Sequence, residues 1–333
     1  MKKVCIFVCF VVILFSGCTK KNSLVDDDVV LILRYADNQP EDFPTTKAAR
    51  YFAALVRDRT DGKINIEVYG NGELGNELDV YQQIQFGGVD FSRLSLGTLS
   101  DVVPFMSVLQ LPYLYEDGNH MWKVLDSEIG DMFLSKMSET GMIGLCWFDA
   151  GARSFYTTSE VSTLEDLQGK VIRVQETKLM SQIIEYLGVK TLQIPYNLVY
   201  SALQMKEIDG AENNPPSYVS KGHNAIAPYF LLDEHFRVPE IVVMSPFARE
   251  KIAKIDEKYI QIIIDCGKEC ARYERELWEK AEKEAFIELE KTGCKITYLS
   301  EAEKEKFRKA MDPVYHIYNE EYGDIIQKII TYK

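Results

Sequence analysis

The segment Tyr81-Gln-Gln-Ile-Gln-Phe-Gly-Gly-Val-Asp90 is matched in the second half of the chain by Tyr200-Ser-Ala-Leu-Gln-Met-Lys-Glu-Ile-Asp209. Both follow the pattern Y-x-x-[IL]-Q-x-x-x-[VI]-D, which is typical of an amphipathic helix that leads into a strand. Upstream, Gly62-Lys-Ile-Asn-Ile66 similarly echoes Gly169-Lys-Val-Ile-Arg173. Two interpretations remain open, because helices followed by strands can converge on such patterns. The sharper one is that the chain forms two pseudo-equivalent α/β lobes.

The sequence around these segments alternates between strand-like and helix-like runs, which predicts an α/β fold. The expected strands cover residues 29–35, 63–69, 142–148, 170–175, 189–194 and 240–244. The expected helices cover residues 45–59, with Thr45 as the N-cap, 78–85 and 256–291. The last of these would be roughly 50 Å long at 1.5 Å per residue, long enough to brace two lobes. Residues 91–95 in one lobe and residues 210–214 in the other would bring side chains to the carboxyl end of a strand, where open α/β sheets bind ligands.

Length and charge exclude several classes of protein. The chain has 333 residues, of which 46% are hydrophobic and 27% are charged. This length is more than one hydrophobic core usually organises, so two lobes are expected. The 38 Lys and Arg residues against 51 Asp and Glu residues give a net charge of −13. Such an acidic surface repels phosphate backbones, so nucleic acid is not expected as a partner.

The N-terminus has the order of a secretory signal. Two lysines precede an apolar run at residues 4–15, and small residues follow at 16–17. The run is shorter than the roughly 20 residues of a membrane span. Residues 14–18 resemble a bacterial lipobox, although Phe15 stands where Leu is usual, so Cys18 is expected to be acylated after removal of the signal peptide at residues 1–17. Residues 18–28 would then form a tether, and the exported protein would touch the membrane only through this anchor, in the periplasm or on the outer face of the cytoplasmic membrane.

The remaining cysteines are too few and too scattered for a disulfide framework. Cys266 and Cys270 have i, i+4 spacing on the long expected helix. That spacing could supply half of a metal site, or both residues could be small buried hydrophobes. The second interpretation is preferred, and no metal is expected.

The segment Gly70-Asn-Gly-Glu-Leu-Gly75 satisfies G-x-G-x-x-G, so a dinucleotide site must be weighed against a simple turn. A Rossmann site uses the first strand of its unit and an acid at the end of the second strand, and neither condition is met here. The turn is therefore preferred, and no cofactor is expected. Sequence patterns of serine hydrolases, zinc proteases and Walker A sites do not occur, but a hydrolase that relies on carboxylates would leave no short motif.

Arg153 and Arg173 lie within otherwise apolar strand-like runs. A guanidinium presents a planar fork that binds a carboxylate through two N–H groups, so a buried arginine implies a buried anion. That anion could be a ligand, or it could be one of the acidic residues of the chain in an internal ion pair.

The chain resembles the DctP-type substrate-binding proteins of TRAP transporters, the tripartite ATP-independent periplasmic class. The resemblance is carried by residues 70–75, by Leu111-Pro-Tyr-Leu114, by Asp166-Leu-Gln-Gly-Lys-Val-Ile-Arg-Val174, and by residues 200–204 and 208–213. It implies a periplasmic-binding-protein-like fold of two lobes with a ligand cleft between them and a long bracing helix. Residues 29–150 and about 239–278 would form the first lobe, and residues 151–238 and about 279–333 the second. The partners implied are a small carboxylate ligand and the membrane permease subunits of the transporter.

The same resemblance implies roles for individual residues. Arg173 would be the carboxylate anchor, Arg153 would assist it, Asn213 would hydrogen-bond the ligand and Tyr196 would pack on it. Asn197 departs from the family, where Glu is common. Residues 151–156, 212–218 and 233–239, together with Arg93, resemble the branch that binds uronic acids and related sugar acids.

Further polar and aromatic residues complete the expected site for a polyhydroxylated acid. They are Gln175, Glu41, Ser95, Trp147, Asn214, Glu212 and His235. A hexuronate fits this inventory best, with a dicarboxylate or an aldonate as the alternative. A periplasmic enzyme acting on a sugar acid and a surface adhesin are alternatives from other classes, and we expect a binding protein without catalytic activity.

Overall fold

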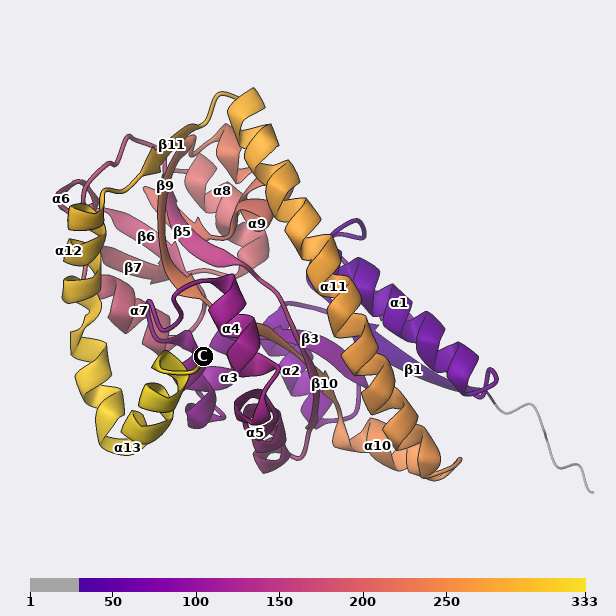
Figure 1. Ribbon diagram of the computed structural model, residues 1–333. Coiled ribbons are helices and arrows are strands. Elements are labelled where there is room, and N and C mark those ends of the chain that lie inside the picture. The colour runs from indigo at the N-terminus through magenta and orange to yellow at the C-terminus, as the bar shows by residue number, and fades with distance from the viewer. Residues whose placement is uncertain (1–29) are drawn as a thin grey trace, which may run out of the picture.

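The computed structural model describes residues 30–333, so the expected signal peptide, Cys18 and the whole of the expected tether lie outside the described residues. The described chain forms two mixed sheets with helices packed around them, which confirms the predicted α/β fold with two lobes (Figure 1).

The first sheet has the order β2-β1-β3-β10-β4. Its strands are β2 (Ile64–Tyr69), β1 (Leu31–Ala36), β3 (Phe91–Ser95), β10 (Glu240–Met244) and β4 (Ile143–Phe148). The first three are parallel to one another, and β10 runs antiparallel to both of its neighbours.

The second sheet has the order β11-β9-β5-β8-β6-β7. Its strands are β11 (Lys295–Tyr298), β9 (Tyr229–Arg237), β5 (Ala152–Thr157), β8 (Gly210–Asn213), β6 (Val171–Val174) and β7 (Lys190–Gln193). Strand β6 is parallel to β7 and β8, and β5 is antiparallel to β8, so the arrangement around β6 repeats the arrangement around β1.

The two aspartates that end the sequence repeat occupy equivalent positions in the two sheets. The N–H of Asp90 donates to the carbonyl of Arg34 at 3.0 Å, and its carboxylate accepts the N–H of the same residue at 2.9 Å. Asp209 makes the same pair of bonds to Val171, both at 2.8 Å. The repeat is therefore structural, since each aspartate fastens the start of its strand, β3 or β8, to the neighbouring strand.

The upstream Gly-Lys echo is not part of this repeat, which corrects the sequence-based alignment. Gly62 precedes β2, which forms an edge of the first sheet, whereas Gly169 precedes β6, which lies one strand inside the second sheet. Both glycines have φ between +70° and +80°, +74° and +78° respectively, so the shared motif is a turn that requires glycine.

The three predicted helices are confirmed as α1 (Pro44–Arg59), α2 (Glu77–Gln85) and α11 (Lys258–Lys291), with ends within two residues of the predicted ones, and the other helices were not predicted. The other α-helices are α3 (Leu96–Ser100), α4 (Gly118–Leu125), α5 (Glu128–Lys136), α6 (Leu164–Leu167), α7 (Lys178–Glu185), α8 (Val199–Gln204), α9 (Pro215–Ser220), α10 (Pro246–Ala253), α12 (Glu301–Met311) and α13 (Pro313–Ile330). The prediction that Thr45 caps the first helix is wrong. Phe43 is the N-cap, because Pro44 occupies the first helical position, where its missing N–H costs nothing.

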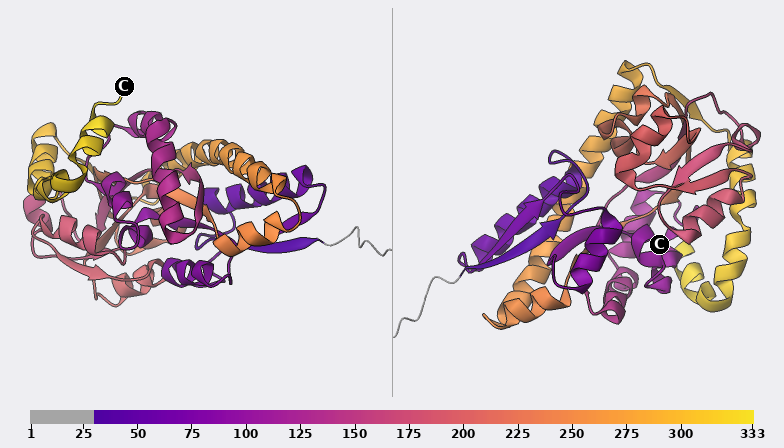
Figure 2. Two further views of the ribbon diagram at one scale, coloured as in Figure 1. Left: turned by 90° about the horizontal axis from the view of Figure 1, so that it is seen from below. Right: turned by 180° about the vertical axis from the view of Figure 1, so that it is seen from behind.

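Helix α11 is the predicted brace. Its 34 residues pack against α1 and β4 in the first lobe and against α9 in the second. Figures 1 and 2 show it running along one side of the molecule beside α1. Cys266 and Cys270 are buried on its inner face in the hydrophobic core of the first lobe, which confirms their interpretation as small buried hydrophobes.

Two short segments, residues 149–151 and 238–239, carry the chain between the sheets. The buried carboxylate of Glu274 on α11 accepts the N–H of Asp149 at 2.8 Å, so the brace also holds one of these crossings. At the C-terminus, the hydroxyl of Tyr315 on α13 donates to the carbonyl of Pro112 at 2.8 Å. The C-terminal helices therefore contact the first lobe as well as the second, and the predicted assignment of residues 279–333 to the second lobe stays a prediction.

Candidate functional site

A cavity of about 410 Å³ lies between the two sheets and draws its walls from both. Small-molecule sites commonly measure roughly 300–1,000 Å³. From the first lobe come Asn38, Gln39, Asn71, Gly72, Gly75, Asn76, Glu77, Leu78, Asp79, Tyr81, Arg93, Thr98, Asp101 and Val102. From the second lobe and the β10 junction come Arg153, Arg173, Gln175, Glu176, Tyr196, Asn197, Asn213, Asn214, Ser217, Lys221 and Glu240. Polar side chains dominate, which suits a hydrophilic ligand.

Arg173 is a buried cation without an anionic partner among residues 30–333. It lies on β6, exposes 3% of its surface, and its Nε donates to the carbonyl of Ile194 at 2.8 Å. The two terminal guanidinium nitrogens donate to no carboxylate in the described part of the chain, and the residue lines the cavity. Burial and the charge of Arg153 lower the pKa of Arg173. Two terminal guanidinium nitrogens that lack an internal carboxylate partner can together bind the carboxylate of a ligand in the cavity.

Arg153, on β5, is paired internally. Its Nε lies 2.5 Å and its Nη2 2.8 Å from the carboxylate of Glu212, and its Nη1 donates to the side chain of Asn213 at 3.0 Å. Burial would raise the pKa of Glu212, but Arg153 lowers it to about 2, so the pair is ionic. His235 lies behind this pair, 3.7 Å from Glu212 and 2.8 Å from Asp233. The pair places a charge-balanced guanidinium on the cavity wall.

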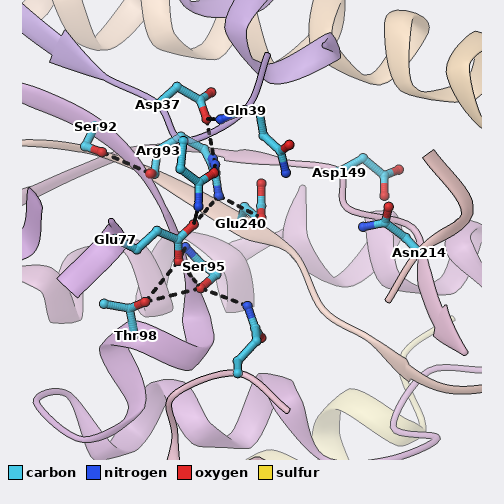
Figure 3. Close-up of polar contacts among 12 residues, drawn as sticks. Asp37, Gln39, Glu77, Ser92, Arg93, Ser95, Thr98, Asp149, Asn214 and Glu240 are labelled. Atoms are coloured by element: carbon cyan, nitrogen blue, oxygen red, sulfur yellow. Dashed lines mark hydrogen bonds and ion pairs between the residues drawn. The ribbon is translucent and has the colours of Figure 1, made fainter. Parts of the chain in front are cut away.

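Arg93, on β3, is surrounded by carboxylates. Its Nη2 lies 2.6 Å from Asp37, and its Nη1 lies 2.5 Å from Glu77 and 3.0 Å from Glu240. The side-chain oxygen of Asn38 also accepts from Arg93. Figure 3 shows the guanidinium between these acids. Burial opposes the charge of Arg93, but the acids raise its pKa well above the ordinary value. Arg93 therefore lines the cavity as part of an anionic cluster.

An aromatic ring and an amine form another part of the wall. The hydroxyl of Tyr196 donates to the carbonyl of Ser217 at 3.2 Å, and the amine of Lys221 lies 5.3 Å from the centre of the Tyr196 ring. Burial lowers the pKa of Lys221. Tyr196 lines the cavity, and an aromatic side chain in the wall suits a pyranose ring.

The lobes touch beside the cavity. The side chain of Gln175 donates to the hydroxyl of Ser95 at 3.4 Å, and the hydroxyls of Ser100 and Thr177 lie 3.3 Å apart. Gly97 faces the same contact, since a Cβ there would lie 3.1 Å from Gln175 and 3.3 Å from Thr177. The cavity is thus closed on this side by direct contact between lobes.

The structure brings seven of the predicted site residues to the cavity wall and places five outside it. The lining residues are Arg173, Arg153, Asn213, Arg93, Tyr196, Gln175 and Asn214, and the others are Glu41, Ser95, Trp147, Glu212 and His235. Three of the five lie directly behind the wall, because Ser95 bonds to Gln175, Glu212 bonds to Arg153, and His235 lies next to Glu212.

Glu41 and Trp147 neither line the cavity nor hydrogen-bond to the residues described above behind its wall, so their prediction as ligand-binding residues is not supported. Glu41 pairs with Arg50 at the surface, where both side chains are about half exposed. Trp147 is buried in a hydrophobic core, and no residue of β4 lines the cavity, since the neighbouring side chains of Cys146 and Phe148 pack into the core on the other side of the strand.

Asp37 and Glu77, the carboxylates of the first lobe that accept hydrogen bonds from Arg93, were not identified from the sequence. Asp37 follows β1 directly, at the carboxyl end of a parallel strand, which is the position where α/β sheets gather ligand-binding groups. Glu77 follows the Gly70–Gly75 turn, whose residues Asn71, Gly72 and Gly75 line the cavity. The turn interpretation of that glycine motif is supported by φ values of +70° at Gly72 and +113° at Gly75.

Two negative findings apply to residues 30–333. No group of His, Cys, Asp and Glu side chains there is arranged to hold a metal ion. Within the same residues, no helix has both the length and the hydropathy of a membrane span.

Comparison with known proteins agrees with this geometry. The sequence profile of the bacterial extracellular solute-binding proteins of family 7, DctP, matches residues 35–321. A solute-binding protein of Chromohalobacter salexigens is 33% identical over 293 residues, which are 88% of this chain and 85% of that protein.

Two solved structures are also similar. One is a TRAP periplasmic solute-binding protein from Xanthobacter autotrophicus Py2 with bound β-D-galacturonate, with 35% identity, a TM-score of 0.86, and coverage of 90% of this chain and 100% of that one. The other, from Pseudomonas putida F1 with bound D-glucuronate, has 32% identity, a TM-score of 0.87, and coverage of 90% and 97%.

Proposed function

The chain belongs to the DctP family of bacterial extracellular solute-binding proteins, and we propose that it captures a hexuronate such as D-glucuronate or D-galacturonate and delivers it to a TRAP permease. The observation that carries this proposal is Arg173, a buried guanidinium whose terminal nitrogens face the cavity without a carboxylate partner among the described residues. A desolvated cation of this kind is costly unless an anion binds it. The carboxylate of the ligand supplies that anion.

The rest of the cavity specifies the hydroxyl-bearing part of the ligand. The carboxyl groups of Glu77 and Glu240 and the amides of Gln39 and Asn214 offer acceptors and donors for several hydroxyl groups. A dicarboxylate would bring a second negative charge to this acidic end, so a monocarboxylate with hydroxyl groups fits better. The galacturonate and glucuronate held by the two similar structures support the same choice.

The described chain supports binding rather than turnover. Glu77 and Glu240 in the cavity wall are held in ion pairs with Arg93, and the family is one of solute-binding proteins. Mass analysis of D-glucuronate after prolonged incubation with the protein tests this directly, because an enzyme would change the mass or the quantity of the acid.

Export and anchoring belong to the same proposal. The family acts outside the cytoplasm, and the N-terminal residues 1–18 have the order of a lipoprotein signal. Acylation of Cys18 would keep the protein at the membrane that holds its permease. Mass spectrometry of the protein from its membrane fraction should show a lipid on Cys18, and Cys18→Ala should release the protein into the soluble extracellular or periplasmic fraction.

The ligand class is tested by a thermal-shift panel at matched concentrations. D-glucuronate and D-galacturonate should raise the melting temperature, while D-glucose and D-galactose, which lack the carboxylate, should not. An equal response to the neutral hexoses would show that Arg173 has a structural role and that the proposed ligand class is wrong. A response to succinate alone would favour a dicarboxylate.

A further inference from the structure

Three carboxyl groups, one buried and two largely buried, share one guanidinium in the cavity wall. The side chains of Arg93 and Asp37 expose 1% and 0% of their surface, and those of Glu77 and Glu240 expose 14% each. One cation balances one carboxylate, so two formal negative charges remain if all three groups are ionised. Uncompensated charges in such a water-poor site are costly, and a carboxyl group relieves the cost by holding a proton.

The hydrogen bonds indicate which carboxyl group holds the proton. Besides the shared guanidinium, Glu77 accepts from the hydroxyls of Ser95 and Thr98 at 2.5 and 3.0 Å. Asp37 accepts a backbone N–H at 3.0 Å. Glu240 accepts only from the shared guanidinium among the hydrogen bonds of residues 30–333. Donors stabilise the charged form of a carboxyl group, so Glu240 is the least stabilised anion of the three. Burial raises the pKa of Glu240 to about 7, although the guanidinium opposes this rise.

The other charged groups around Glu240 do not compensate it. They come from five elements or junctions, namely Asp37 after β1, Glu77 on α2, Arg93 on β3, Arg153 on β5 and Glu274 on α11. The two cations in this set already have carboxylate partners, Arg93 within the cluster and Arg153 in its pair with Glu212. Glu240 itself lies at the start of β10, directly after the crossing segment at residues 238–239, and lines the cavity.

We propose that the protein takes up a proton together with its ligand, and that Glu240 holds this proton and donates a hydrogen bond to a ligand hydroxyl. The inference rests on the proposed capture of a uronate. The ligand adds a negative charge to the cavity and displaces water from the wall, and both changes favour the neutral carboxyl form. A neutral carboxyl group also has an O–H to donate, which a carboxylate lacks.

Titration calorimetry with D-galacturonate measures the proton directly. At pH 7, the observed enthalpy in phosphate, imidazole and Tris buffers should vary linearly with the ionisation enthalpy of the buffer, with a slope of about 0.5 proton taken up per ligand, since a group with a pKa near 7 is half protonated in the free protein. Affinity should fall about tenfold between pH 6 and pH 8, because the protonated fraction of the free site falls by that factor. The carboxyl group of the ligand is ionised throughout this range.

Two variants assign the proton to its residue. Glu240→Gln is neutral at every pH, so proton uptake should vanish and affinity should no longer change between pH 6 and pH 8. Glu282→Gln is the matched control, because Glu282 lies on α11 outside the residues that line the cavity, and burial raises its pKa as well. Proton uptake should persist in this control.

Several results would overturn the inference. Zero uptake or proton release by the unmodified protein would do so, as would uptake that survives Glu240→Gln or disappears in Glu282→Gln. The proton count of the unmodified protein decides the matter even if Glu240→Gln does not fold. Binding of the uronate without proton uptake would contradict only this inference, whereas failure of every uronate to bind would contradict the proposed function and this inference together.

Discussion

The two lobes share a strand arrangement but differ in how they treat a buried arginine. In each lobe, an aspartate of the sequence repeat, Asp90 or Asp209, clasps the backbone of the neighbouring parallel strand. In the first lobe, Arg93 meets three carboxylates of the same lobe or of its junction. In the second lobe, the described bond of Arg173 goes to a backbone carbonyl, and its charge is left to the cavity.

This difference gives the cavity a polarity. The first lobe offers carboxyl groups and amides, which bind hydroxyl groups, and the second lobe offers a free guanidinium, which binds a carboxylate. A ligand with a carboxylate at one end and hydroxyl groups at the other satisfies both lobes in a single orientation. A ligand that contacts both lobes at once should draw them together, so we expect the lobes to close when it binds.

The largest expected difference in stability is between replacement of Arg93 and replacement of Arg173 in the protein without ligand. Arg93→Met should lower the free energy of unfolding by about 3–5 kcal/mol, since it leaves buried carboxylates without their cation. Arg173→Met should cost little or should stabilise the free protein, because it removes a buried charge that lacks a carboxylate partner. Urea denaturation at pH 7.5 without ligand measures both. Equal losses in the two variants would show that the lobes do not differ in this way.

Although replacement of Arg173 should cost little stability, it should strongly weaken ligand binding. Arg173→Ala should lose about 2–5 kcal/mol of binding free energy for D-glucuronate, a loss of roughly 30- to several-thousand-fold in affinity. Arg173→Lys should also bind poorly, because an ammonium keeps the charge and loses the planar fork. Arg249→Ala, which removes an exposed arginine 3.4 Å from Glu257, is the control and should bind normally. Native affinity in a folded Arg173→Ala protein would refute its role as anchor.

Contact between the lobes can be tested at Gly97. A Cβ at this position would lie 3.3 Å from the Cγ2 of Thr177 in the other lobe, so the larger side chain of Gly97→Val should hold the lobes apart. Overpacking of this kind costs about 1–3 kcal/mol, which here should weaken binding and leave the open form stable. Small-angle scattering should show a smaller radius of gyration when saturating D-glucuronate is added to the unmodified protein, and less shrinkage in the variant. An unchanged radius in the unmodified protein would argue against closure.

The smallest effects should come from the two equivalent aspartates. Asp209→Asn keeps an acceptor for the N–H of Val171 but loses the charge, and should cost about 1 kcal/mol of stability. Asp90→Asn should cost slightly more, because Asp90 also lies 2.8 Å from the amine of Lys251. Denaturation of both variants tests the equivalence, and a loss in only one of them would show that the repeat is not energetically shared.

The repeat, the strand pattern and the brace could be predicted because each depends on residues close together in the sequence. The partners of the three arginines could not be predicted from the sequence. Arg93, Arg153 and Arg173 have similar local sequence surroundings, but Asp37, Glu77 and Glu240 reach Arg93 from three separate parts of the chain. Trp147 was assigned to the cavity because of its size and ring, whereas the side to which it points depends on the register of β4 against β10. Distant pairing of this kind is decided by packing and leaves no local signal.

The polarity of the cavity is tested most directly by a crystal structure of the protein with bound D-galacturonate. We predict that the ligand carboxylate lies within hydrogen-bonding distance of both terminal nitrogens of Arg173, with the ring hydroxyls directed toward Glu77 and Glu240. A carboxylate bound to Arg93, or ring hydroxyls placed against Arg173 with the carboxylate elsewhere, would contradict the assignment of opposite roles to the two lobes.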